Sequence, residues 1–337
     1  MSTTPARPAT AATSARHTTD STPGPADPPR RWALRTRSRA GKQHARKHHQ
    51  GPRNLTAAAL FLLPALALIV ILRLVPVIQA VTDATHSSLP GSALAPQWVG
   101  LDNFTALWHS ETFWTSVQQT LLFNVIVNPL QVAIALGLAV LLTQNLPASG
   151  LWRTLIFLPA AVPMTGSAVV WGIALRPDGP ANALLGSVGI DPQPFLTSPH
   201  QVVASLVLIA SWIGVGYWMI FLIAGLNDIP QVYYEAAKVD GAGPLRRFWS
   251  ITLPQLKRPL LFVLVADTVS NFVLFAPMQI LTNGGPEQKS NFLMYDIFHN
   301  SFELADPHTA AAELLVLLGL MIVIVAVQFR LLGEAED

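Results

Sequence analysis

Long apolar runs are the feature that most limits how this sequence can fold. Six mostly apolar segments occur, at residues 55–81, 115–143, 151–175, 201–226, 259–282 and 307–332. A helix that crosses a bilayer needs about 20 such residues. Charged residues make up only 12% of the chain, whereas a soluble domain carries about 25%. The sequence therefore predicts an all-α membrane protein with six transmembrane helices.

Prolines and helix-start residues add detail to this prediction. Neighbouring helices or water can satisfy the carbonyl groups that a proline frees inside a span. Prolines inside spans kink their helices, and such kinks are typical of a helical bundle around a cavity. A kink with a purely structural role explains each proline equally well. The prolines inside the predicted spans are Pro64, Pro76, Pro129, Pro159, Pro163 and Pro277. Ser198-Pro199 and Asp306-Pro307 precede the fourth and sixth spans as candidate N-caps followed by proline.

The basic residues are unevenly distributed, and this predicts an orientation. Residues 1–54 hold 11 of the 21 Lys and Arg residues but two of the 19 acidic ones. With a cytoplasmic N-terminus, 18 of the 21 basic residues lie on the cytoplasmic side, as the positive-inside rule requires. We expect cytoplasmic N- and C-termini, a basic disordered tail (1–54), a membrane domain (55–332) and a short C-terminal tail (333–337). We interpret the basic tail as a topology signal and expect no nucleic-acid binding.

The loop 227–258 is polar and basic, and this orientation makes it cytoplasmic. Its "VYYEAAKV" run predicts a short helix, which the Asp-Gly-Ala-Gly sequence at 240–243 then interrupts with a turn. A second short helix follows, with Leu245, Phe248 and Trp249 on one apolar face. The residues alone leave two interpretations open in equal measure: an element that anchors two spans at the membrane surface, and a surface that docks a partner.

The sequence "EAAKVDGAGPLRRFWSITLP" within this loop resembles the EAA loop of ATP-binding cassette (ABC) importer permeases, carbohydrate-uptake branch. The positions that match the pattern are Glu235, Ala236, Ala237, Asp240, Gly241, Ala242, Phe248, Ile251, Leu253 and Pro254. "FLPAAVPMTGSAVVW" at 157–171, "GPANALL" at 179–185 and "LTNGGPEQKSNFLMYDIFHNSF" at 281–302 resemble further parts of that family. The resemblance covers residues 55–332 and leaves out the basic tail.

The resemblance implies a six-helix type I permease subunit in the bacterial cytoplasmic (inner) membrane. The loop would then be the coupling element that inserts into a cleft on a cytoplasmic ATPase. Glu235 would make polar contacts, Ala236 and Ala237 would pack closely, and Gly241 would make the turn; Asp240, Ala242, Leu253 and Pro254 complete the expected coupling residues. No G-x-x-x-x-G-K-[ST] phosphate loop occurs in the sequence. We therefore expect no enzyme activity and no bound cofactor in this chain, with ATP and Mg held by the ATPase.

The resemblance also implies the other parts of the transporter. These are a second, different permease subunit, two ATPase subunits, an external solute-binding protein and the surrounding membrane lipids. The solute would be a sugar or oligosaccharide, and a glycerol phosphate ester belongs to the same branch.

Polar residues inside the predicted spans are candidates for the solute pathway. Amide and ionisable groups are costly in a bilayer, so they face a cavity or another helix. Aromatic rings with amides suit a polyhydroxylated solute, and each residue alone is more often a contact between helices. The candidates are Asn124, Asn128, Gln131, Tyr217, Trp218, Asp267, Asn271 and Gln279. Asp267 is the most costly of them, and Arg73 is a weak candidate for its partner.

Three other functions compete with that of an ATP-driven importer. An ion-coupled secondary transporter would use Asp267 as its ion site, but six spans without an internal repeat are unusual for that class. An intramembrane enzyme would rely on His299, Glu303, Asp306 and His308, which lack metal-ligand spacing such as H-E-x-x-H. The absence of cysteine excludes thiol catalysis and disulfides, and we expect no metal site. A scaffold protein would explain the loop but not the polar spans.

Overall fold

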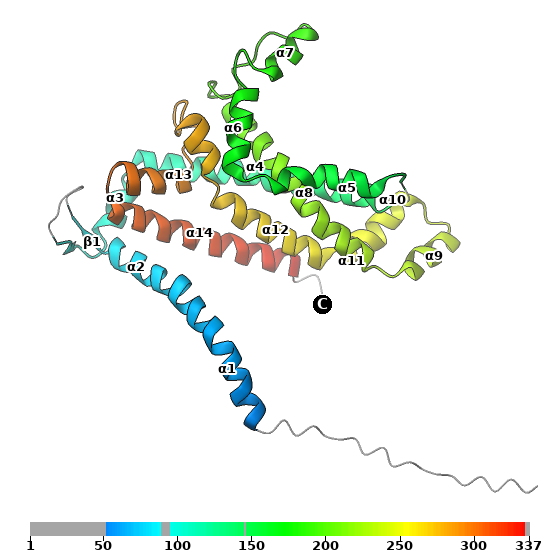
Figure 1. Cartoon of the computed structure of the whole chain (residues 1–337), viewed down its shortest axis with the longest axis horizontal. Helices are drawn as coiled ribbons and strands as arrows, with labels where there is room; N and C mark the ends of the chain where they lie inside the picture. Colours follow the sequence, from blue (N-terminus) through cyan, green and yellow to red (C-terminus); the bar gives the residue numbers. More distant parts are fainter. Residues whose placement is uncertain (1–51, 89–94, 145, 334–337) are drawn as a thin grey trace, which may run out of the picture. The chain divides into compact units, whose positions relative to one another are not determined.

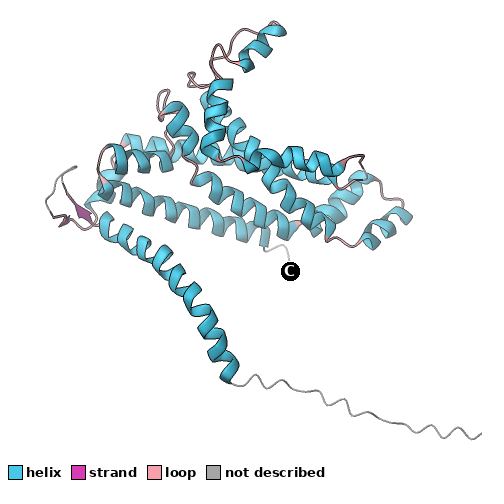
Figure 2. Ribbon diagram, viewed as in Figure 1, coloured by secondary structure: helices cyan, strands magenta, loops and turns pink. Residues whose placement is uncertain are grey.

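The computed structural model describes residues 52–88, 95–144 and 146–333, and most of this part is helical (Figure 2). The N-terminal segment consists of α1 (Pro52–Ile69), the π-helical turn η1 (Val70–Leu74) and α2 (Val75–Ala84). A two-stranded antiparallel sheet follows, in which β1 (His86–Ser87) pairs with β2 (Gln97–Trp98). The predicted tail (1–54) falls almost wholly outside the described residues, as do 334–337.

The long helices form the body of the membrane domain. In chain order the elements are α3 (Asp102–Trp108), α4 (Glu111–Leu142), α5 (Ser149–Phe157), η2 (Leu158–Ala161), α6 (Met164–Ala174), α7 (Pro180–Ser187) and α8 (Val202–Asn227). The second half holds α9 (Gln231–Val239), α10 (Pro244–Arg247), η3 (Phe248–Thr252), α11 (Leu253–Gln255), α12 (Lys257–Phe272), η4 (Met278–Thr282), α13 (Leu293–Phe298), η5 (His299–Glu303) and α14 (Pro307–Gly333). Helices α4, α8, α12 and α14 lie side by side, and α12 contacts the other three (Figure 1).

Four of the predicted spans are long, apolar helices among the described residues. They are Ala59–Ala84, Glu111–Leu142, Val202–Asn227 and Pro307–Leu331, which correspond to the first, second, fourth and sixth predicted spans. Asp306 caps α14 as predicted, because its Oδ1 accepts a hydrogen bond from Thr309 N at 3.1 Å. Ser198 instead accepts a hydrogen bond from His200 N in a turn, and α8 begins only at Val202.

The third predicted span is bent. Its two halves, Ser149–Ala161 and Met164–Ala174, meet at an angle of 97°. Val162 and Pro163 between them are extended, with ψ of 129° and 140°. A proline pushes the residue before it away from helical backbone, so the Val162-Pro163 pair explains the bend. This proline thus does more than kink a continuous helix.

The fifth predicted span is interrupted. Helix α12 has 16 residues and ends at Phe272, and the next helical turn forms only around η4. Pro277 lies at the start of that second turn, where its missing N–H is tolerated. Helix α12 alone is too short to cross a bilayer. The described residues therefore contain four helices that are long and apolar enough to be spans, or five spans if the bent pair is counted as one.

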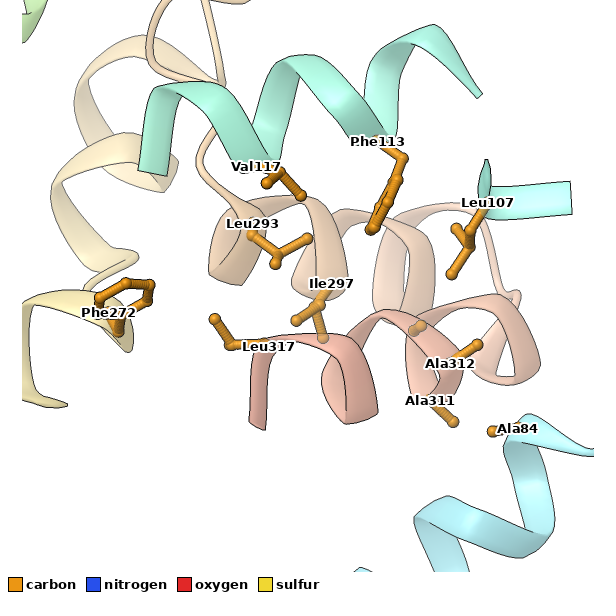
Figure 3. Close-up of a cluster of buried hydrophobic side chains, with 11 residues drawn as sticks. Ala84, Leu107, Phe113, Val117, Phe272, Leu293, Ile297, Ala311, Ala312 and Leu317 are labelled. Carbon is orange, nitrogen blue, oxygen red and sulfur yellow. The ribbon is translucent and has the colours of Figure 1, made fainter. Parts of the chain in front are cut away.

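A hydrophobic cluster holds one end of the bundle together (Figure 3). Leu293 and Ile297 of α13 lie between α4 and α14, where they face Phe113 and Val117 on one side and Leu317 on the other. Burying such side chains stabilises a fold by about 1.5–3 kcal/mol each in water. The cluster fixes α13 and thereby the polar residues that follow along the same helix.

Candidate functional site

The loop between α8 and α12 folds as two short helical segments joined by a turn, as the sequence predicts. Helix α9 ends at Val239, and the turn closes with hydrogen bonds from Gly241 N to Lys238 O (3.1 Å) and from Ala242 N to Ala237 O (2.8 Å). Gly241 has a φ of +75°, which L-residues with a side chain rarely adopt. A Cβ there would meet nothing within 4 Å, so backbone conformation rather than space requires glycine.

The second segment runs from Pro244 to Gln255 with a wide turn in its middle. Pro254 is the second residue after the π-helical turn η3, so the carbonyl four residues before it lies inside that turn. In a regular α-helix a proline ring clashes with the carbonyl four residues earlier, and a wider turn moves that carbonyl away. Tyr234 and Thr252 join the two segments through a 3.0 Å hydrogen bond between their hydroxyl groups.

The surface of this loop combines a carboxylate, small residues and apolar side chains. Glu235, Ala236 and Asp240 are exposed. Leu245 and Trp249, two members of the predicted apolar face, are 72% and 60% exposed. Exposed apolar surface of this kind fits a partner or a membrane interface. Leu253 is half-buried and Pro254 exposed at the end of the same segment.

A buried polar network connects the central helices, and Asp267 on α12 is its hub. Trp218 Nε1 of α8 donates to Asp267 Oδ1 at 2.6 Å, and Asn271 Nδ2 donates to the same oxygen at 3.1 Å. The side-chain amide of Gln131 on α4, oriented to satisfy both of its ends, also donates to Asp267 Oδ1 at 2.7 Å and accepts from Ser211 N at 3.3 Å. The hub therefore links α4, α8 and α12.

The network continues along α4 toward α14. Asn271 Nδ2 donates to Asn128 Oδ1 at 2.8 Å, and Asn128 Nδ2 donates to Asn124 Oδ1 at 3.2 Å. Thr268 Oγ1 accepts from Asn128 Nδ2 at 3.1 Å and from Gln328 Nε2 of α14 at 2.8 Å. Four helices are thus joined by side-chain hydrogen bonds, the means by which polar residues hold membrane helices together.

The structure divides the eight pathway candidates into two groups. Six are buried and belong to the network described above: Asn124, Asn128, Gln131, Trp218, Asp267 and Asn271. Tyr217 is 42% exposed, with its ring against Trp218 and Phe221. Gln279 lies on η4, where it donates to Glu303 Oε1 at 3.2 Å. Asp267 Oδ2 has no hydrogen-bond partner among the described residues, and the partners of Oδ1 do not include Arg73.

The residues of the rival enzyme hypothesis make structural contacts. His308 contacts Asp83 O and Ser88 Oγ, each at 3.0 Å, and so joins α14 to the segment around β1. Asp306 caps α14, and His299 lies 3.8 Å from Glu303. The described residues contain no group of three or more His, Cys, Asp or Glu side chains arranged to hold a metal ion.

A polar pocket of about 520 Å³ was not anticipated from the sequence. It is lined by the end of α3, the start of α4, the loop 283–291, α13, η5 and the first two turns of α14, and two buried acidic side chains, Asp296 and Glu313, lie in its wall. Asn300 Nδ2 donates to Glu313 Oε1 at 2.8 Å. The available signal was Glu313 itself, an acidic residue inside the apolar segment 307–332.

Comparison with known proteins gives one family. The model of the family described as "Binding-protein-dependent transport system inner membrane component" matches residues 131–333. The lactose transport system permease protein LacF of Rhizobium radiobacter is 31% identical, over 79% of this chain and 90% of LacF. The sn-glycerol-3-phosphate permease UgpA of Yersinia enterocolitica is 34% identical, over 80% of this chain and 92% of UgpA.

Solved structures agree on the fold. A crystal structure of a bacterial ABC transporter involved in the import of the acidic polysaccharide alginate has a TM-score of 0.72, with 21% identity over 85% of this chain and 98% of that chain. A second structure of the alginate transporter, in complex with an alginate pentasaccharide-bound periplasmic protein, has a TM-score of 0.71 with 21% identity, over 83% of this chain and 94% of that chain.

Proposed function

Because the chain belongs to the family of binding-protein-dependent transport system inner membrane components, we propose that it is the permease subunit of an ATP-driven importer and forms half of a translocation pathway. Its fold is the all-helical fold of ABC importer permeases, and it is a multi-pass membrane protein. We further propose six spans, with the bent and interrupted segments as the third and fifth, cytoplasmic termini, and a location in the bacterial inner membrane.

One observation carries the proposal: the exposed loop of two helical segments around Gly241. Glu235, Leu245 and Trp249 are exposed on this loop, and no other part of the described chain buries them. A separate ATPase that contacts this surface differently in its open and closed states would shift the permease between inward-open and outward-open forms. Helix α12 begins two residues after the loop's second segment, so movement of the loop reaches the Asp267 network directly.

The proposed partners follow from the family. Two ATPase subunits would hold ATP and Mg and carry out hydrolysis, a second and different permease subunit would complete the pathway, and an external binding protein would deliver the solute. The solute would be a sugar or oligosaccharide. The names of the relatives support this class and show its range, from lactose to sn-glycerol-3-phosphate.

The experiment is co-expression of the transporter with variants in the loop. We expect Glu235→Ala to lower co-purification of the ATPase and to abolish uptake, because the ATPase loses its polar contact with the exposed carboxylate. Gly241→Pro should do the same, because proline fixes φ near −65° where the turn needs +75°. Membrane insertion, measured by the amount of protein in the membrane fraction, should not change.

Two control variants separate loop function from general damage. Gly243→Ala changes a glycine of the same turn that has a φ of −68° and open space around it. Asp191→Ala removes an exposed carboxylate far along the chain, between α7 and α8. Both controls should keep uptake and ATPase binding. Full ATPase complement and normal uptake in Glu235→Ala would overturn the proposal.

An ion-coupled secondary transporter is the second candidate, and the unpartnered Oδ2 of Asp267 is the observation that favours it. A coupling site must exchange its ion or proton, so Asp267→Asn would abolish uptake in that case. An ATP-driven importer should tolerate Asp267→Asn, and its uptake should survive a proton-gradient uncoupler. Uptake in the presence of the uncoupler, measured with radiolabelled solute, decides between the two.

A further inference from the structure

The polar pocket beside α13 carries an inference about which solutes this chain accepts. The pocket has a volume of about 520 Å³, which lies within the range of small-molecule sites and far above the volume of one ion. Ser110, Thr112 and Gln288 contribute hydroxyl and amide groups to its wall, and Tyr295 contributes an aromatic ring. Such a lining can bind an organic solute that carries many hydroxyl groups.

Two buried acidic side chains lie in the wall of the pocket. Asp296 is 6% exposed and Glu313 is 2% exposed. Among the described residues that line the pocket there is no Lys or Arg, and His299 is the basic side chain nearest to Asp296 along α13 and η5. Burial raises the pKa of Asp296, while hydrogen bonds from Asn291 and Ser116 and the charge of His299 act in the opposite direction. A bound anion would therefore meet buried carboxylates without a compensating cation.

Two buried oxygen atoms in the wall lack a hydrogen-bond donor. Asn291 is 5% exposed; its Nδ2 donates to Asp296 Oδ1 at 3.4 Å, but its Oδ1 has no partner among the described residues. Glu313 Oε1 accepts from Asn300, but Glu313 Oε2 has no partner there either. Leaving a buried polar atom unpaired costs about 1–3 kcal/mol. Asn291 Oδ1 can only accept a hydrogen bond, so its missing partner is a donor such as a sugar hydroxyl; a hydroxyl can also pair with a carboxyl oxygen such as Glu313 Oε2 in either protonation state.

We propose that this pocket is a solute subsite that binds an uncharged, polyhydroxylated molecule and excludes anionic ones. Hydroxyl groups of the solute would donate to Asn291 Oδ1 and pair with Glu313 Oε2. The identity of the ligand as the transported solute rests on the proposed importer function. This pocket would repel the anionic solutes that are named for relatives of this chain, but it would accept a neutral sugar. The solute class is thereby narrowed to uncharged molecules.

The first test measures the charge of the pocket without knowledge of the solute. The native chain has no cysteine, so Thr112→Cys places a single thiol in the pocket wall of the full chain, studied in lipid nanodiscs. A cationic methanethiosulfonate should label it about tenfold faster than an anionic one, after correction for a free thiol, because charged clefts concentrate counter-ions by 10–10³. Glu313→Gln should reduce this ratio. Asp178→Asn, which removes an exposed carboxylate between α6 and α7 and outside the pocket wall, should not.

The second test uses the same thiol to detect the solute. A panel of neutral mono- and disaccharides, with lactose among them, should contain a sugar that slows the labelling, and sn-glycerol-3-phosphate should not. Asn291→Ala should weaken the protection by that sugar. Equal labelling rates for the two reagents would overturn the proposal, as would protection by sn-glycerol-3-phosphate or by none of the neutral sugars. If these tests fail while ATP-dependent uptake persists, the pocket is not a subsite and the importer function stands.

Discussion

Asp267 shows at the scale of a single residue how the membrane domain satisfies a costly carboxylate. Its Oδ1 accepts from Trp218 Nε1 and Asn271 Nδ2 in an environment where the side chain is only 1% exposed. A charged or polar group so placed is tolerated because several donors converge on it. These donors use the carboxyl oxygen as their hydrogen-bond acceptor. Asp267 therefore matters to its neighbours as an acceptor as well as through its charge.

This dependence predicts different outcomes for two substitutions of Asp267. Asp267→Ala removes the acceptor and leaves Trp218 Nε1 unpaired, at a cost of about 1–3 kcal/mol, while Asn271 Nδ2 keeps its bond to Asn128 Oδ1. Asp267→Asn keeps an oxygen at the hub and removes the buried charge, so it should melt close to the native chain. Thermal unfolding in detergent, followed by tryptophan fluorescence, measures both. A loss in Asp267→Asn as large as in Asp267→Ala would show that the charge, and not the acceptor, holds the helices.

At the scale of the elements, α8 and α12 meet closely at the base of the exposed loop. A Cβ on Gly225 of α8 would lie 2.8 Å from Cγ of Pro259, which is in the first turn of α12. The proline ring cannot rotate away, so the two helices approach each other only because residue 225 is glycine. The two ends of the loop, Asn227 and Lys257, are therefore held near one another.

We expect Gly225→Ala to destabilise the protein by about 1–3 kcal/mol, the usual cost of overpacking a tight contact. Gly137→Ala on α4 is the matched control, since a Cβ there would meet nothing within 4 Å and alanine favours the helix by about 1 kcal/mol. Thermal unfolding of the two variants under the same conditions gives the comparison. Equal melting temperatures for Gly225→Ala and the native chain would show that the contact is looser than the structure has it.

The elements also show what a sequence of this kind can and cannot predict. The turn at Gly241 and the Asp306 cap of α14 depend on a few adjacent residues, so local chemistry was sufficient. The hydrogen bond between Trp218 and Asp267 joins residues 49 positions apart, and apolar runs give no information on which helices face each other. The pocket around Asp296 and Glu313 could not be predicted for the same reason, because it forms only when α13 packs against α14.

At the scale of the whole molecule, the number of spans depends on whether the segment 259–282 crosses the membrane. Helix α12 is short for a bilayer of about 30 Å, since each residue of an α-helix advances 1.5 Å. The η4 turn after the break at Val273 supplies additional length. The network around Asp267 pairs the polar groups of α12 with α4, α8 and α14, which gives the segment a protein environment rather than a lipid one.

The absence of cysteine from the native chain allows the crossing to be tested directly. Ser187→Cys, Ser250→Cys and Glu287→Cys each place one thiol at an exposed position, on α7, in η3 and in the loop after η4. If both α8 and the 259–282 segment cross, an impermeant thiol reagent applied to intact cells should label the variants at 187 and 287. It should label the variant at 250 only after the membrane is permeabilised. The decisive pair is 250 and 287, because they flank the interrupted segment. Labelling of both from the same side would mean that this segment enters and leaves on one face, and that the importer half has five spans.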